Sequence, residues 1–302
     1  MSDVLTVRPT GLLRYERCRY SYHLSVNLKI GTAETSHSTV FGKAGHKAVL
    51  GYVAAHAEGG GLDPVPIFLR AFEEQLDTNI VSFTRHDAKE LKEIGTKLCQ
   101  AFPAKWDASG LIAVKARGRV MVENRIRFHL SKDIVLSAEP DVVARRKDGP
   151  EHELEIPDVK FPASAAFLGF AKVSDQLTAY QLAVAVDAPS QGLGDVIVKG
   201  VGFLEGLKKK DAEWHMQMVP AHSRDRLGEY VSKVKANVAL IRRGYFQKRT
   251  GEAWDTPCAM CDFRNLCIDG DATGLSSPLG DVLELVNAPM TVQVQSVSQQ
   301  AA

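Results

Sequence analysis

The spacing of hydrophobic positions changes several times along the chain, and each spacing predicts a different kind of element. Apolar residues recur three or four positions apart in stretches that indicate helices: 10–23, 38–57, 65–79, 87–106 and 224–246. They alternate or run continuously in stretches that indicate strands: 111–140, 141–146, 152–161, 196–205 and 214–219. Segments 31–37 and 57–64 fit neither pattern, and the second is rich in glycine, so both are predicted as loops.

The segment from Ala138 to Tyr180 combines a predicted hairpin with charged residues at its open end. Two β-type runs, DVVARR and HELEIPDVKF, flank the sequence KDGPE, whose Asp-Gly and Pro are strong turn signals. Asp141 opens the first strand and Asp158 closes the second, and antiparallel pairing brings such ends side by side. Lys160 shares a face with Asp158, because side chains two positions apart on a strand point the same way.

Two carboxylates and one ammonium group at a sheet edge are sufficient to hold a hard divalent cation and a nucleophilic water. Hard cations bind carboxylate and carbonyl oxygens, lower the pKa of bound water and stabilise charge at a phosphorus centre. The alternative is that these are surface aspartate and lysine residues that only flank a hairpin.

The order of these motifs resembles the PD-(D/E)xK nuclease superfamily, and within it the RecB-type branch. The resemblance is carried by Pro140-Asp141, by the Asp158-Val159-Lys160 triplet and by a following helix with Gln176 and Tyr180 one turn apart. It implies an α/β fold with a restriction-endonuclease-like core, in which helices flank a mixed central sheet. A helical insertion is expected at about 58–108.

The resemblance also assigns roles to individual residues. It implies that one or two Mg²⁺ or Mn²⁺ ions are held by His46, Asp141, Asp158 and the backbone carbonyl of Val159. Lys160 would orient or deprotonate the attacking water. Gln176 and Tyr180 would contact the scissile strand or steady Lys160, although Tyr180 could equally be a core aromatic residue.

His46 is placed on the predicted helix 38–57, within a Gly42-x-x-x-His46 motif. Glycine destabilises a helix, so Gly42 and Gly45 predict that another group approaches the helix backbone closely. A single histidine on a helix is more often partly exposed than a ligand, and the metal-binding role comes from the resemblance. Glu123, in the strand-like region, could aid the metal site or face solvent.

The chain has five cysteines, too few for a disulfide framework in a protein of this length. Cys258, Cys261 and Cys267 form C-x-x-C-x5-C, which is typical of soft-metal ligands, and Cys18 is the candidate fourth ligand. Cys99 lies in a helical pattern and is predicted to be a buried thiol. The four other thiols resemble those that hold a 4Fe–4S cluster in the RecB-type iron–sulfur nucleases, which include AddB-like and CRISPR-adaptation nucleases. A zinc site on the same thiols, or no metal, remains open.

Composition adds few constraints. The net charge of +1 over 302 residues gives no global attraction to nucleic acid, so DNA binding would need a local basic patch. The candidates are Arg145, Arg146 and Lys147, the run 208–210, and Arg242, Arg243, Lys248 and Arg249. No secretory signal, membrane-length apolar run or G-x-x-x-x-G-K-[ST] loop is visible. We therefore expect a cytoplasmic protein with no membrane contact, and any helicase partner would be a separate protein.

The combined expectation is a single nuclease domain at 1–272, with an iron–sulfur cap built from 10–24 and 250–270 and a flexible tail at 273–302. It would be a Mg/Mn-dependent deoxyribonuclease, an exonuclease that acts on single-stranded DNA or free ends in recombination, repair or end processing. A recombination protein as partner and a homo-oligomer are left open. The alternatives are a catalytically silent DNA-binding or assembly protein on the same fold, and a zinc-stapled scaffold that is not a nuclease.

Overall fold

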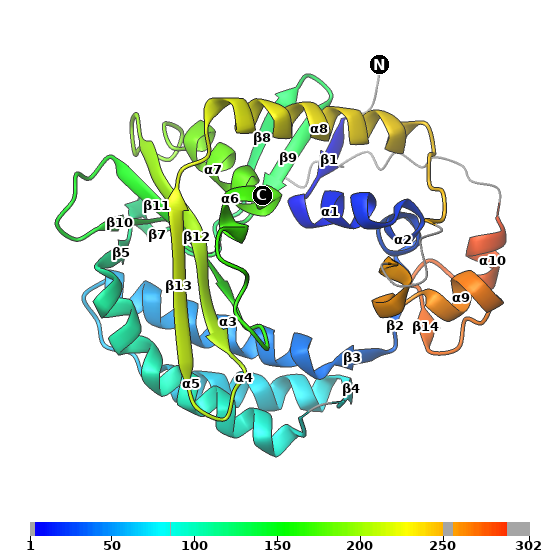
Figure 1. The fold of residues 1–302 in the computed structure, drawn as a ribbon, viewed down its shortest axis with the longest axis horizontal. Coiled ribbons are helices and arrows are strands. Elements are labelled where there is room, and N and C mark those ends of the chain that lie inside the picture. Colours follow the sequence, from blue (N-terminus) through cyan, green and yellow to red (C-terminus); the bar gives the residue numbers. More distant parts are fainter. Residues whose placement is uncertain (1–3, 85, 250–255, 289–302) are drawn as a thin grey trace. The chain divides into compact units, whose positions relative to one another are not determined.

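The computed structural model describes residues 4–84, 86–249 and 256–288, which divide into two compact units (Figure 1). The motif unit contains Thr35–Arg127 and Ala138–Leu227. The cysteine unit contains the chain up to Glu34, Phe128–Ser137 and the chain from Gly228 on. The predicted single domain at 1–272 stays a prediction.

The motif unit is built on a mixed five-stranded sheet with the order β13-β12-β11-β10-β5. Its strands are β5 (Leu111–Ala113), β10 (Ala144–Arg146), β11 (Glu153–Lys160), β12 (Ile197–Leu207) and β13 (Glu213–Pro220). β10 and β11 pair antiparallel, which confirms the predicted hairpin, whereas β11 and β12 pair parallel. The expected mixed sheet is therefore present, and β11 lies at its centre.

Helices cover both faces of this sheet (Figure 1). On one face lie α3 (His37–Ala57), α4 (Pro64–Thr78) and α5 (Ala88–Ser109), and α6 (Phe170–Val173) and α7 (Asp175–Asp187) lie on the other. Local signals fix several helix ends: a capping box of Asp87 and Glu90 begins α5, and Gly110, with φ 69°, ends it. Helices α4 and α5 match the two helices predicted after the glycine-rich loop; that they are an insertion stays a prediction.

Alternation along β11 divides its side chains between the two faces. Val159 packs in a core cluster with Val49, Val53, Phe102 and Trp106 of α3 and α5. Asp158, the preceding residue, therefore points to the opposite face, where α7 lies. This alternation places a charged residue on the central strand of the sheet, opposite the apolar cluster around Val159.

A short hairpin follows β5 and leads towards Asp141. Its strands are β6 (Lys115–Ala116) and β7 (Arg119–Val120), and the turn residues Arg117 and Gly118 have φ of 49° and 76°. Two positive φ angles are typical of the tight turn that suits antiparallel strands. Beyond it, Val122 bridges Val142, so the chain after the hairpin runs beside the segment that carries Asp141.

The cysteine unit has its own small sheet and core. β1 (Leu5–Val7) pairs parallel with β9 (Ile134–Ala138), which also neighbours β8 (Ile126–Ser131). Apolar side chains near both ends of the chain form one cluster: Leu24, Ile30, Phe263, Leu266 and Val282. The further elements are α8 (Arg224–Arg242, whose first four residues belong to the motif unit), α9 (Arg264–Asp269) and a 3₁₀ turn (Pro257–Met260).

Three segments differ from the sequence-based expectations. The helix predicted at 10–23 is divided into α1 (Pro9–Arg17) and α2 (Arg19–Tyr22) by the extended backbone of Cys18, and a π-helical turn follows. The loop predicted at 31–37 contains strands β2 (Gly31–Thr32) and β3 (Glu34–Ser36). β14 (Leu275–Ser276) pairs with β2, and α10 (Val282–Asn287) follows, so the predicted tail is structured as far as Asn287. The rest of that tail and residues 250–255 of the predicted cap lie outside the described residues.

Within the described residues, no helix is both long and apolar enough to span a membrane.

Candidate active site

The two predicted aspartates lie side by side in the motif unit. The backbone N–H of Val159 donates to Asp141 Oδ2 at 2.7 Å, which holds Asp141 against β11. The carboxyl groups of Asp141 and Asp158 are within hydrogen-bonding reach of each other. The structure thus places both acids close enough to share one ion.

Asp158 is a fully buried carboxyl group with little compensation. Its exposure is 0%, and neither of its oxygens has a hydrogen bond of good geometry, although Lys160 is close. Burial raises the pKa of Asp158 to about 7, the Lys160 charge opposes that shift, and Asp141 adds to it. Such a site is costly for the isolated protein, because Asp158 and Asp141 have to share Lys160 and each buried charge needs a partner. A bound cation would supply one.

Lys160 contacts Asp158 directly, with 2.5 Å between Nζ and Oδ2. Burial alone would lower the pKa of Lys160, but Asp158 and Asp141 together outweigh it and raise the pKa. Lys160 is therefore an ammonium ion at neutral pH. This favours an electrostatic role over that of a general base.

His46 reaches the acids from α3. Its Nδ1 lies 3.8 Å from Asp141 Oδ1, and the ring also interacts with the backbone of Val159. Burial lowers the pKa of His46, and Lys160 lowers it further against the opposing charges of Asp158 and Glu123. The neutral imidazole that results is the form that binds a metal ion.

One of the two glycines beside His46 has the predicted close neighbour. A Cβ on Gly45 would lie 2.5 Å from the Phe161 ring, whereas a Cβ on Gly42 would have nothing within 4 Å. The prediction is confirmed for Gly45 and wrong for Gly42. Because Phe161 directly follows Lys160, the Gly45 contact fixes helix α3 against the end of β11.

Helix α7 brings Tyr180 to the same place. Burial raises the pKa of Tyr180, and the neighbouring charge of Asp158 raises it further. Gln176 Nε2 donates to the Tyr180 hydroxyl at 2.7 Å. The two residues of the predicted helix motif are therefore hydrogen-bonded to each other, and Tyr180 lies beside Asp158 and Asp141.

Glu123 is a further acidic residue near this site. It acts on the pKa values of both His46 and Asp141, and its backbone N–H donates to the Asp141 carbonyl at 3.0 Å. Its φ of 47° is unusual for a residue other than glycine, and such outliers cluster at functional sites. The sequence offered no signal beyond an acidic residue in a strand-like stretch.

The donor set around the acids fits a hard divalent cation. Asp141, Asp158, Glu123 and the carbonyl of Val159 offer oxygens, and His46 offers a nitrogen. The buried, poorly bonded oxygens of Asp158 support this assignment. Within residues 4–84, 86–249 and 256–288, however, no three His, Cys, Asp or Glu side chains are already arranged to enclose an ion.

The four predicted thiol ligands all lie in the cysteine unit. Burial raises the pKa values of Cys261 and Cys267, and the nearby thiols of Cys18 and Cys258 raise both further. Cys99 lies apart from them in the core of the motif unit, where burial raises its pKa to about 12. It is a buried thiol, as predicted. The four others are near one another, although they do not already enclose an ion.

Ion pairing separates the basic residues into two groups. Several predicted DNA contacts have acidic partners: Arg146 with Glu155, Lys147 with Asp107, Lys209 with Glu213 and Arg242 with Asp133. The cations of the β6–β7 hairpin and its neighbour do not have such partners among the described residues: Lys115, Arg117, Arg119 and Arg145.

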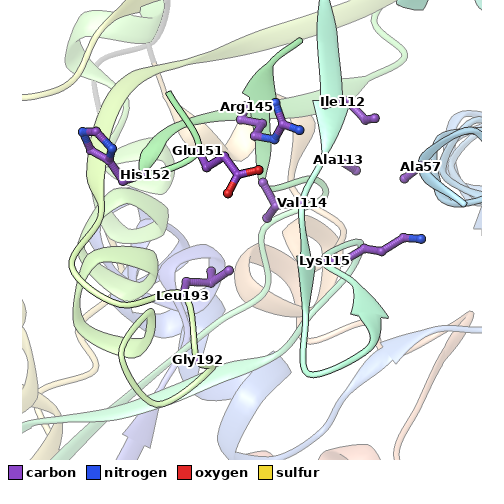
Figure 2. A pocket seen from close by; sticks show the side chains of 10 residues that line it. All are labelled: Ala57, Ile112, Ala113, Val114, Lys115, Arg145, Glu151, His152, Gly192 and Leu193. Carbon is purple, nitrogen blue, oxygen red and sulfur yellow. The ribbon is translucent and has the colours of Figure 1, made fainter. Parts of the chain in front are cut away.

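These four cations line two cavities of the motif unit. One, of about 630 Å³, includes Lys115 and Arg145 (Figure 2), and the other, of about 640 Å³, includes Arg117, Arg119 and Glu123. Figure 2 shows Lys115 directed away from Arg145, so the first cavity has no convergent cationic centre. The second cavity is lined both by the hairpin cations and by Glu123, whose charge raises the pKa of Asp141.

One comparison with known proteins identifies a family for this chain. The family model described as the PD-(D/E)XK nuclease superfamily matches residues 6–268. A search of curated proteins gave no significant match. Among solved structures, one described as "Putative exonuclease" from Eubacterium rectale aligns with a TM-score of 0.48 at 12% identity and covers 87% of each chain. A second, SSO0001, aligns with a TM-score of 0.40 at 11% identity, covering 89% of this chain and 88% of the other. The assignment to a family therefore depends on the family model.

Proposed function

Because the chain belongs to the PD-(D/E)XK nuclease superfamily, we propose that it is a metal-dependent deoxyribonuclease that hydrolyses DNA phosphodiester bonds. The observation that carries this proposal is the contact between Asp141, Asp158 and Lys160 in a site where the Asp158 oxygens are buried and poorly bonded. Two buried carboxyl groups there share one ammonium partner, Lys160, so a bound cation would balance the second negative charge.

The residues divide the chemistry among them. Asp141, Asp158, His46 and the Val159 carbonyl would hold Mg²⁺ or Mn²⁺, with Glu123 as a further oxygen donor. Bound there, the ion would supply a water of lowered pKa and positive charge beside the phosphate. The positive charge of the Lys160 ammonium group would stabilise the negative charge that develops in the transition state. Tyr180, held by Gln176, lies beside the acids, where its hydroxyl can orient the scissile strand.

Exonuclease action on single strands or free ends is the narrower part of the proposal, and the resemblance to the RecB-type branch supports it. The DNA backbone would lie along the β6–β7 hairpin, where unpaired cations extend from the site. The proposal also includes a 4Fe–4S cluster on Cys18, Cys258, Cys261 and Cys267, because four thiolates are the usual ligand set. Its role is to join the two ends of the cysteine unit.

Cleavage assays test the enzymatic proposal. Wild-type protein should cut DNA with Mn²⁺ or Mg²⁺ and not with EDTA, and Lys160→Ala should lose cutting while it keeps most DNA affinity. Strands labelled at either end, with free and blocked termini, distinguish exonuclease from endonuclease action. Equal cutting by wild type and Lys160→Ala would remove Lys160 from the mechanism, and no cutting by either would favour a DNA-binding protein.

A further inference from the structure

An apolar patch projects from the segment between the catalytic strand and the Gln176 helix. It consists of Phe167, Leu168, Phe170 and Val173, which are 67%, 94%, 40% and 58% exposed. Exposed apolar side chains that cluster in this way mark an interaction site, because scattered ones are normal but contiguous ones are not. The chain itself places the patch between Lys160 and Gln176.

Aromatic contacts connect this patch to Asp158. Phe203 of β12 is the strand partner of Asp158, and strand partners project their side chains to the same face of a sheet. Phe170 stacks on Phe203 at 5.6 Å between ring centroids, and Phe167 meets Phe170 at 5.3 Å. Exposure rises along this series, from buried Asp158 and Phe203 to Phe167, so the rings lead outward from the acid to solvent.

The backbone beneath the patch is fixed by hydrogen bonds to buried and half-buried polar side chains. The Ala166 N–H donates to Glu205 Oε1 at 2.9 Å, and Gln217 Nε2 donates to the Ala166 carbonyl at 2.9 Å. The Arg226 guanidinium bonds the Val173 carbonyl at 3.0 Å at the other end. These contacts anchor both ends of the segment while its apolar side chains remain exposed. The rings are therefore presented to solvent by a fixed backbone.

We propose that this patch stacks the unpaired bases next to the scissile phosphate, and that the preferred substrate is consequently a single strand or a frayed end. The proposal rests on the proposed nuclease function. Base stacking suits exposed aromatic rings that adjoin a phosphate-binding centre, and it tolerates any sequence because every base has an aromatic face. Lys172, exposed in the same segment and without an acidic partner among the described residues, would meet the backbone of that strand.

Binding of a fluorescein-labelled single-stranded oligonucleotide in EDTA tests the patch without cleavage. Phe167→Ala combined with Leu168→Ala should weaken binding about tenfold or more, as expected for loss of base stacking. Phe167→Trp should bind like wild type, whereas Phe167→Leu, which keeps an apolar side chain, should bind as weakly as Phe167→Ala. Phe83→Ala removes another ring that is 40% exposed and should leave binding unchanged.

An otherwise identical oligonucleotide with abasic sites provides the decisive comparison. Wild type and the double variant should bind it equally, because it has no bases to stack. Equal binding of the normal strand by both proteins, or the same loss on both strands, would overturn the proposal. So would light scattering that shows a wild-type dimer dissociated by Leu168→Ala, because a second copy would then cover the patch.

Cleavage separates this inference from the nuclease assignment. If wild type cuts DNA with Mn²⁺ but the patch variants bind and cut normally, the stacking proposal fails alone. If no metal permits cutting although the stacking differences are found, the nuclease assignment fails and the patch remains a single-strand binding surface.

Discussion

The Phe161 ring occupies the space where residue 45 would carry a side chain, since a Cβ on Gly45 would lie 2.5 Å from it. This contact joins helix α3, which carries His46, to the end of β11, which carries Asp158 and Lys160. The geometry of the site therefore depends on the absence of one methyl group.

Substitution at the two glycines of α3 should have opposite effects. Gly45→Ala should destabilise the protein by about 1–3 kcal/mol through overpacking, and it should reduce cleavage by displacing Phe161. Gly42→Ala, where a Cβ meets nothing within 4 Å, should stabilise the helix by about 0.5–1 kcal/mol. Urea unfolding measures both. Equal effects of the two substitutions would contradict the packing argument.

Two substitutions at Glu123 separate its charge from its backbone conformation. Glu123→Gln should reduce Mn²⁺-dependent cleavage without a gain in stability. Glu123→Gly should reduce cleavage as well, but it should relieve the left-handed backbone, whose cost is about 1 kcal/mol for a residue with a Cβ. Cleavage rates and urea midpoints are the measurements. Full activity of Glu123→Gln would exclude the carboxylate from the site.

The hairpin cations should contribute to DNA affinity through phosphates alone. Arg117→Ala with Arg119→Ala should weaken binding similarly for all sequences and reduce the salt dependence of the binding constant by about one counterion per lost contact. Lys92→Ala, on α5 and ion-paired with Glu73, is the matched control and should leave both quantities unchanged. Titrations at several salt concentrations decide between these outcomes.

The cysteine unit should depend on Cys18 and not on Cys99. Cys18→Ser should lower the iron content and destabilise the protein, because it removes one of four thiolate ligands. Cys99→Ser should retain the iron, since Cys99 lies in the apolar core of the motif unit. Iron analysis and visible absorption of fresh protein test this. Colourless wild-type protein with stoichiometric zinc would replace iron by zinc in the proposal.

His222 should make the protein less stable in mild acid. Burial lowers its pKa from 6.5, and Arg226 lowers it further against the Ala171 carbonyl and Asp175. The unfolded chain therefore binds the proton more readily, and the contribution of His222, present above pH 6.5, is lost as pH falls towards the folded-state pKa. His222→Gln should flatten this loss in urea unfolding between about pH 7.5 and about pH 5. His129→Gln, at an exposed histidine, should not.

Hydrophobic periodicity predicted most of the regular elements, because burial on one face imposes a helical or strand period on the sequence itself. The hairpin of β10 and β11 and helices α3 and α5 follow from that pattern and from short-range turn and cap signals, whereas α7 was expected from the family resemblance. The break at Cys18 and the strand pair of β2 and β14 could not be predicted in this way. The strand pair joins segments that are distant in the chain, and the apolar pattern of 10–23 carries no signal of the extended backbone at Cys18.

The sequence by itself determined which residue types are available for catalysis, and their order indicated Asp141, Asp158, Lys160, His46 and Tyr180 as candidates. Only the tertiary structure decided that Gly45 and not Gly42 has a close neighbour, and that Glu123 acts on the acids. It also decided which cations have no acidic partner among the described residues. It placed Phe167 at the exposed end of a row of phenylalanine rings that begins at Phe203, the strand partner of Asp158. The physical reason is that burial, pairing and electrostatic potential are properties of neighbours in space, which the linear order of residues does not specify.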